Sequence, residues 1–195
     1  MSDFVAFVRL GFGHIVSLDA MDHLLFLVAL AVVYRVGEWR SLLWAISAFT
    51  VGHSITLALA VTNVVRFPTE WIEFLIPVTI VATAVANIIS LRDARVSSPR
   101  VILVGLFGLI HGAGFATYLR ELFLESIAIP LAGFNVGIEI GQIAVVAVCW
   151  SLMLAVDGAA RKKLRDRWTP YQARVLVVSS VVAVVSTAWL AARVP

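Results

Sequence analysis

Four histidines and several carboxylates lie within or at the edge of long apolar stretches, where ionisable side chains are rare. They are His14, His23, His53 and His111, with Asp19, Asp22 and Glu139. A charge at the centre of a bilayer costs at least about 2.5 to 3.5 kcal/mol on insertion scales, so such residues need a partner or a bound ion. One histidine of this kind is as readily a hydrogen-bonded packing residue as a ligand, but a cluster favours a site.

The spacing of the polar residues places them on shared faces of predicted helices. Three groups follow such a pattern: Asp19, Asp22 and His23; Ser47, Thr50 and His53; and Asn135, Glu139 and Gln142. A fourth helix contributes His111, which is surrounded by glycines that let helices approach closely or leave room for a ligand. We therefore expect polar faces from several helices to meet inside the bundle.

Imidazole nitrogen with carboxylate oxygen is the ligand set of borderline divalent ions such as Ni²⁺, Zn²⁺, Co²⁺ and Fe²⁺. Copper(I) would favour methionine and cysteine, and Met21 is the one sulfur near these residues. Protons can use the same groups, because histidine titrates near neutral pH. Helix positions predict an outer group, Asp22 with His23, and a central group made of His53, His111 and Glu139.

The elements that position these residues are predicted to be transmembrane helices. Of 195 residues, 61% are hydrophobic and 14% are charged, and apolar runs long enough for a hydrocarbon core, about 20 helical residues, recur along the chain. Continuous runs favour an all-α bundle over a barrel. We predict a polytopic membrane helix bundle that forms one transmembrane domain, residues 1–195, with six spans at about 18–34, 43–64, 71–91, 101–119, 131–156 and 175–192.

The segment ahead of the first span also has helical apolar spacing, at Phe4, Val5, Val8, Phe12 and Ile15. It predicts an interfacial helix, or an extension of the first span that is kinked near Gly11 and Gly13. The first residues lack the basic start and cleavage site of a signal peptide, so we expect none to be removed.

Most basic residues fall in loops on one side of the predicted membrane: Arg35, Arg40, Arg92, Arg95, Arg100, Arg161, Lys162, Lys163, Arg165, Arg167 and Arg174. The other side has Arg9, Arg66, Arg120 and Arg193. The positive-inside rule therefore predicts a multi-pass protein of the cell (inner) membrane with both termini on the non-cytoplasmic side. The net charge of +3 orients the chain in lipid and does not indicate nucleic-acid binding.

Four segments together resemble the HupE/UreJ family of small membrane proteins. They are GFGHI with DHLLFLVAL, FTVGHSITLALA, GLIHGAGFA and FNVGIEIGQ, which cover about Gly11 to Gln142. Members of that family are regarded as nickel permeases, so the resemblance implies uptake of a divalent transition-metal ion, with nickel favoured and zinc, cobalt or iron as alternatives. By that match the ligands would be His14, Asp22, His23, His53, His111 and Glu139.

The first motif departs from the family pattern in its spacing. The family has five residues between the first histidine and the Asp-His pair, whereas seven separate His14 from Asp22, and Asp19 is an additional carboxylate. Secondary ligands are then predicted at Asp19, Asn135 and Gln142. Glu73 and Asn87 share one face of the third predicted span, and the sequence leaves their role open.

Two other functions fit the same residues. An integral-membrane metalloenzyme would hold zinc or iron in the His and carboxylate cluster and keep one position open for water. A structural or accessory protein would use the polar faces to hold helices together. The sequence does not distinguish transport from catalysis. It also does not give the oligomeric state, and a homo-oligomer is one of the options.

Overall fold

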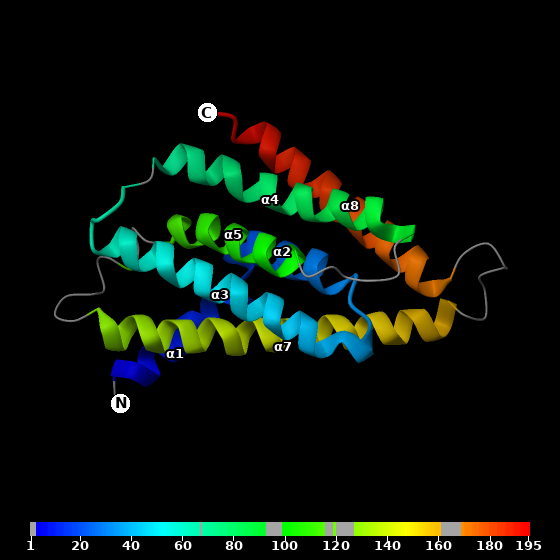
Figure 1. Cartoon of the computed structure of the whole chain (residues 1–195), viewed down its shortest axis with the longest axis horizontal. Helices are drawn as coiled ribbons and strands as arrows, with labels where there is room; N and C mark the ends of the chain where they lie inside the picture. Colours follow the sequence, from blue (N-terminus) through cyan, green and yellow to red (C-terminus); the bar gives the residue numbers. More distant parts are fainter. Residues whose placement is uncertain (1–2, 67, 93–98, 116–118, 120–126, 161–168) are drawn as a thin grey trace.

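The computed structural model describes residues 3–66, 68–92, 99–115, 119, 127–160 and 169–195 (Figure 1). Every secondary-structure element in these residues is helical, as predicted. The long helices are α1 (Asp3–Val16), α2 (Met21–Ala31), α3 (Trp39–Val61), α4 (Thr69–Ile89), α5 (Pro99–Gly114), α7 (Ala128–Ala160) and α8 (Pro170–Ala192). Three short 3₁₀ helices lie between them: η1 (Leu18–Ala20), η2 (Val36–Glu38) and η3 (Ser90–Arg92).

The helices fit a multi-pass membrane protein, but six spans are not confirmed. Four described helices, α3, α4, α7 and α8, are long and apolar enough to cross a membrane. The pair α1 and α2 passes the same test together as one span that is bent by 57°. Helix α5, as far as the structure describes it, has 16 residues, which is shorter than the roughly 20 residues of a typical span. Residues 116–118 of the predicted fourth span lie outside the described residues, and so do seven of the 15 basic residues: Arg95, Arg120, Arg161, Lys162, Lys163, Arg165 and Arg167.

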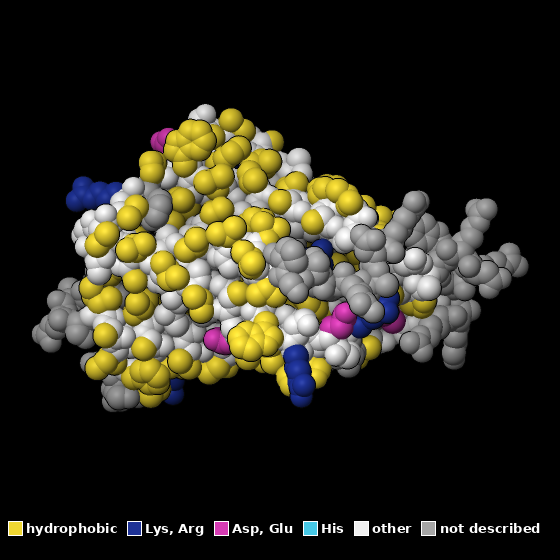
Figure 2. All heavy atoms as spheres, viewed as in Figure 1, with side chains coloured by type: hydrophobic (Ala, Val, Ile, Leu, Met, Phe, Trp, Pro, Cys, Tyr) yellow, Lys and Arg dark blue, Asp and Glu magenta, His cyan; other side chains and the backbone are white. Residues whose placement is uncertain are grey.

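The surface of the bundle carries large apolar side chains, as contact with lipid requires. Trp44, Ile102 and Val184 are 71%, 70% and 70% exposed and belong to three different helices. Figure 2 shows hydrophobic side chains over most of the described part of one face. Burial of this surface in hydrocarbon, and not in a larger protein core, accounts for the composition.

Glycines bring two pairs of helices into backbone contact. In the pair α3 and α5, a Cβ at Gly52 would lie 2.1 Å from the carbonyl oxygen of Gly105. In the pair α1 and α7, a Cβ at Gly137 would lie 2.1 Å from the carbonyl oxygen of Val8. Close packing of small residues is how helices associate in lipid, where the hydrophobic effect gives no force between them. These contacts fix His14 relative to α7, and α3 relative to α5.

The chain bends after α1, and the predicted kink near Gly11 and Gly13 is wrong. Helix α1 continues through both glycines, because Gly11 packs on the backbone of α7, where a Cβ would lie 2.0 Å from the oxygen of Phe134. The break lies at Ser17–Ala20, where the Ser17 hydroxyl accepts the Asp19 N–H at 3.1 Å and caps η1. Asp19 is thus in η1 and does not share a helix face with the residues of α2.

Helix α2 is short and central, and it contacts α4, α7 and α8 (Figure 1). Its 11 residues end among buried Val32, Val33 and Tyr34, so its last carbonyls need donors from other helices. Side chains provide them: Asn87 Nδ2 to Ala29 O at 2.7 Å, Trp150 Nε1 to Ala31 O at 3.4 Å and Tyr171 Oη to Val33 O at 3.0 Å. Three helices thereby hold α2 in place, with its N-terminus directed to the opposite end.

Candidate metal centre

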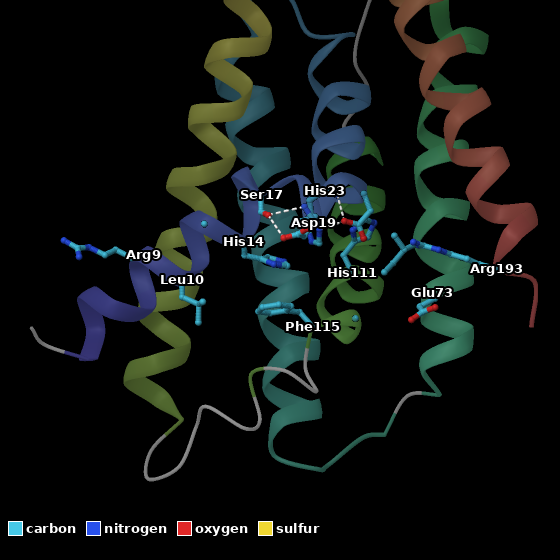
Figure 3. A pocket seen from close by; sticks show the side chains of 15 residues that line it. Arg9, Leu10, His14, Ser17, Asp19, His23, Glu73, His111, Phe115 and Arg193 are labelled. Atoms are coloured by element: carbon cyan, nitrogen blue, oxygen red, sulfur yellow. Dashed lines mark hydrogen bonds and ion pairs between the residues drawn. The ribbon is translucent and has the colours of Figure 1, made fainter.

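A cavity of about 590 Å³ lies at the N-terminus of α2, at the end of the bundle where α1 begins and α8 ends. Its lining includes His14, Asp22, His23 and His111. In Figure 3 the histidines converge at this point, whereas the side chain of Arg9 on α1 extends away from them. The lining residues come from the bent pair α1 and α2, from α4, from the last turn of α5 and from the end of α8.

All four histidines predicted as ligands gather around one imidazole, that of His23. Its ring centroid lies 4.9 Å from that of His14, 5.1 Å from that of His111 and 5.9 Å from that of His53. The four rings come from α1, α2, α3 and α5. The structure thus forms one group in place of the separate outer and central groups expected from helix positions, because the bend after α1 carries the start of α2 into the bundle.

Most of the ring nitrogens in this group are buried and have no hydrogen-bond partner among the described residues. They are His14 Nε2, His23 Nε2, both nitrogens of His53, and His111 Nδ1. Buried polar atoms nearly always have a partner, so an accumulation of unpartnered ring nitrogens requires an explanation. Nitrogen lone pairs that converge on a cavity are the arrangement expected of ligands to a cation.

The carboxylate of Asp22 orients His23. One oxygen, Oδ1, accepts the backbone N–H of His23 at 2.7 Å and lies 2.9 Å from its ring Nδ1. Because a carboxylate oxygen only accepts, Nδ1 carries the hydrogen and Nε2 has the free lone pair. A carboxylate that fixes the tautomer and raises the basicity of a histidine is the usual outer partner of a metal ligand.

Thr79 of α4 has the same effect on His111. Its hydroxyl donates to the carbonyl oxygen of Ile76 at 2.7 Å and lies 3.0 Å from His111 Nε2. Since the single hydroxyl hydrogen is used, Nε2 must carry the ring hydrogen and Nδ1 is the free acceptor. The sequence reasoning missed Thr79, although Thr79, Thr83 and Asn87 recur every four residues on one buried face of an apolar helix.

Three of these residues are close enough to hold one ion together. Asp22, His23 and His111 each offer a ligand atom, and the three atoms lie within 4.8 Å of one another. Two imidazoles with one carboxylate fit a borderline divalent cation. The positive end of the α2 dipole opposes a cation here, and the negative charge of Asp22 in the first turn compensates for it.

His53 lies behind this group and does not line the cavity. It is fully buried, and its ring lies 6.4 Å from that of His14 and 5.9 Å from that of His23. Its ring also lies 6.1 Å from that of Phe49, which is itself 6.1 Å from the ring of His23. A cation that leaves the cavity toward the centre of the bundle would therefore meet His53 next.

A family model for the HupE/UreJ proteins matches residues 1–193. The chain belongs to the HupE/UreJ family. The resemblance seen in the sequence motifs is thereby confirmed, and it extends over nearly the whole chain. Searches of curated proteins and of solved structures found no match to the chain.

Aromatic rings enclose the histidines of this HupE/UreJ protein. The ring of Phe115 lies 4.0 Å from that of His14 and stacks on Phe134 at 5.4 Å. Phe26 and Phe49 lie 5.3 and 5.2 Å from the ring of His111. Such an apolar shell restricts ring rotation and limits the access of water to the site. The sequence reasoning did not select these phenylalanines, because apolar residues fill every predicted span.

Two polar residues of α7 in the HupE/UreJ protein, Glu139 and Gln142, bind α3 and do not line the cavity. Glu139 accepts the Ser47 hydroxyl at 2.6 Å, and Gln142 Oε1 accepts the Thr50 hydroxyl at 2.9 Å. Asn135 has a buried Oδ1 with no partner among the described residues. These contacts link the two predicted polar faces. A ligand role for Glu139, Asn135 or Gln142 stays a prediction.

Asp19, Glu73 and Asn87 differ in where they lie: two of them line the cavity and one is buried between helices. Asp19 and Glu73 line the cavity of this HupE/UreJ protein, where Glu73 is exposed and Asp19 Oδ2 accepts the Ser17 hydroxyl at 3.1 Å. Asn87 is 1% exposed and donates to the Ala29 carbonyl, so its role is structural. Glu73 and Asn87 therefore do not act together, although both belong to α4.

Proposed function

We propose that this chain carries a divalent transition-metal ion across the membrane, and that nickel is the first candidate, with cobalt, zinc and iron as alternatives. One observation carries the proposal: the imidazoles of His14, His23 and His111 and the Asp22 carboxylate converge on one cavity, with the ring of His53 next to that of His23, and all four imidazoles have buried nitrogens without a partner among the described residues. Membership of the HupE/UreJ family supports it, because members are regarded as nickel permeases. The ion is the substrate, so the site must bind it and also release it.

The residues have distinct proposed roles. Asp22 attracts the cation into the cavity, and its charge balances part of the charge of the ion. His23 and His111 bind it through Nε2 and Nδ1, the nitrogens that their partners leave free. His14, at the end of α1, completes the group. Neutral imidazoles select borderline metals over Mg²⁺ and Ca²⁺, which prefer oxygen ligands.

The onward route is proposed to follow α3. His53 accepts the ion from the cavity, and Glu139, paired with Ser47, receives it further inward. Ser47 and His53 are six residues apart on α3, or roughly 9 Å along its axis. A series of binding positions of moderate affinity lets the ion pass from one to the next, whereas one tight site would retain it.

The direction is proposed to be uptake. The cavity lies at the end that the basic residues predict to be non-cytoplasmic, in the inner membrane, with both termini on that side. In this arrangement the cavity collects the ion outside the cell. We propose that the chain forms one transmembrane domain, since its helices share one buried apolar core.

Uptake of radioactive nickel into proteoliposomes tests the proposal. We expect saturable uptake by the wild type, inhibition by cobalt, and loss of uptake in His23→Ala and His111→Ala. Glu70→Ala is a matched control, because Glu70 is an exposed residue of α4 that does not line the cavity. Uptake that persists in both histidine variants would exclude this transport site. Stoichiometric metal without any flux would instead favour the metalloenzyme.

A further inference from the structure

A second cavity, of about 200 Å³, lies at the opposite end of the bundle from the histidines. It is formed where α2 and α7 end and α8 begins, and its polar lining consists of Tyr34, Arg35, Trp150, Asp157, Tyr171 and Arg174. None of these residues belongs to the proposed transport site. The cavity thus needs its own explanation.

The charges in this cavity leave one guanidinium without a counterion. Arg174 forms an ion pair with Asp157, so these two charges compensate each other. Arg35 has no ion pair among the described residues, and Glu38 accepts the backbone N–H of Arg35 at 2.8 Å. The guanidinium of Arg35 instead lies over the ring of Tyr171, 4.6 Å from its centroid. The cavity therefore has a net positive charge that is already positioned.

Tyr34, which also lines this cavity, carries a hydrogen-bond donor. Its side chain is 1% exposed, and its buried hydroxyl has no hydrogen-bond partner among the described residues. A buried hydroxyl without a partner costs free energy, so an acceptor in the cavity would relieve that cost. A guanidinium with a hydroxyl donor is a combination that binds phosphate oxygens.

The other lining residues connect the cavity with the surface that faces lipid. Met153 and Leu154 of α7 line it, and Leu154 is 53% exposed. Trp150 of α7 also lines the cavity, and its indole N–H donates to the Ala31 carbonyl oxygen. A ligand with a phosphate group and an apolar portion would match both parts of this lining, whereas inorganic phosphate would match only the polar part.

We propose that this cavity binds the phosphate of an anionic phospholipid headgroup from the leaflet at this end of the bundle. Arg35 and Tyr34 hold the phosphate oxygens, and the lipid backbone lies against Leu154 and Trp150. Basic pockets between transmembrane helices are known sites for such headgroups. A bound lipid would join the end of α2 to α7 and α8, the helices that hold α2 in place.

Native mass spectrometry of the purified full chain, with thermal unfolding in detergent, tests the proposal. Phosphatidylglycerol is expected to bind and to raise the Tm, whereas phosphatidylcholine and sodium phosphate at matched concentrations are not. Arg35→Gln should weaken phosphatidylglycerol binding roughly five- to tenfold, the loss expected from removing one arginine. Tyr34→Phe removes only the hydroxyl, so it tests the site without a change of charge or packing.

Arg40→Gln is the matched control, because Arg40 is an exposed arginine at the same end that lies over Trp39 and does not line the cavity. An equal loss in Arg35→Gln and Arg40→Gln would show general attraction to an anionic surface and overturn the site. Equal stabilisation by sodium phosphate would overturn the lipid assignment. Unchanged binding in both Arg35→Gln and Tyr34→Phe would overturn it as well.

Discussion

The Thr79 hydroxyl and the His111 imidazole form a hydrogen bond of 3.0 Å in which Thr79 can only accept. Thr79 donates to Ile76 within its own helix, so its remaining lone pair receives the Nε2 hydrogen of His111. A residue of α4 thereby decides which nitrogen of a histidine on α5 is free. The free nitrogen, Nδ1, belongs to the residue that lies within 4.8 Å of the ligand atoms of Asp22 and His23.

Thr79→Val is therefore expected to weaken metal binding although Thr79 touches no ion in the proposed site. Valine keeps the shape but leaves the His111 N–H without an acceptor, so the tautomer and the ring angle are no longer fixed. Loss of such an outer partner typically costs roughly 10- to 100-fold in metal affinity. Nickel titration by calorimetry in detergent measures the effect. Thr79→Ser retains the hydroxyl and should bind within about threefold of the wild type; an equal loss in both variants would contradict this role.

Asp22 and Asp19 are three residues apart and both line the cavity, yet we expect only one of them to determine affinity. Asp22→Asn removes the charge and weakens the contact that fixes His23 Nδ1, so nickel affinity should fall by about tenfold or more. Asp19 is in η1 and pairs with Ser17, so Asp19→Asn should have little effect. Competition with a fluorescent nickel chelator compares the two variants directly. A larger loss in Asp19→Asn would make Asp19 the first carboxylate of the site.

That the histidines gather could be predicted from residue types and helical spacing, but the predicted division into an outer and a central group is not what the structure has. An imidazole such as His53 in the middle of an apolar span needs a compensating partner, and several spans carried one. That the rings meet follows from the cost of burying them separately. The family motifs indicated that His14 is also a ligand, although its spacing to Asp22 differs from the family pattern. In the structure the ring of His14 lies 4.9 Å from that of His23.

Other features depend on tertiary contacts that no local pattern contains. The bend at Ser17–Ala20 cannot be read from Gly11 and Gly13, because those glycines could serve either bending or close packing, and Gly11 serves packing on α7. The partner of Glu139 was also hidden, since an acidic residue on a polar helix face suits a metal and a serine hydroxyl equally well. Only the placement of α3 beside α7 shows that the partner is Ser47.

The glycine contacts of α3 and α5 predict which glycines tolerate a methyl group. A Cβ at Gly108 would lie 2.2 Å from the carbonyl oxygen of Phe49, so Gly108→Ala must push the two helices apart. Overpacking of this kind costs about 1–3 kcal/mol and would shift His111 relative to His53. Gly158→Ala is the control, because nothing lies within 4 Å of a Cβ there. Thermal unfolding in detergent should show a lower Tm for Gly108→Ala alone; equal Tm values would disprove the close contact.

Glu139→Gln separates binding in the cavity from transport through the bundle. Glu139 is bonded to Ser47 and is not part of the group formed by Asp22, His23 and His111, so the variant should bind nickel as the wild type does. Glutamine still accepts the Ser47 hydroxyl, so the contact between α3 and α7 is kept while the charge is lost. If Glu139 receives the ion after His53, nickel uptake into proteoliposomes must fall sharply although binding is unchanged.

The companion variant Ser47→Ala distinguishes the charge of Glu139 from its hydrogen bond. It removes the hydroxyl and leaves the carboxylate, so uptake should persist if the charge is what moves the ion. Loss of uptake in Ser47→Ala with normal uptake in Glu139→Gln would reduce the pair to a link between two helices. Loss of nickel binding in Glu139→Gln would instead join Glu139 to the ligands around His23. Because binding and uptake are measured on the same preparation, each of these results identifies a different function for one carboxylate inside the membrane.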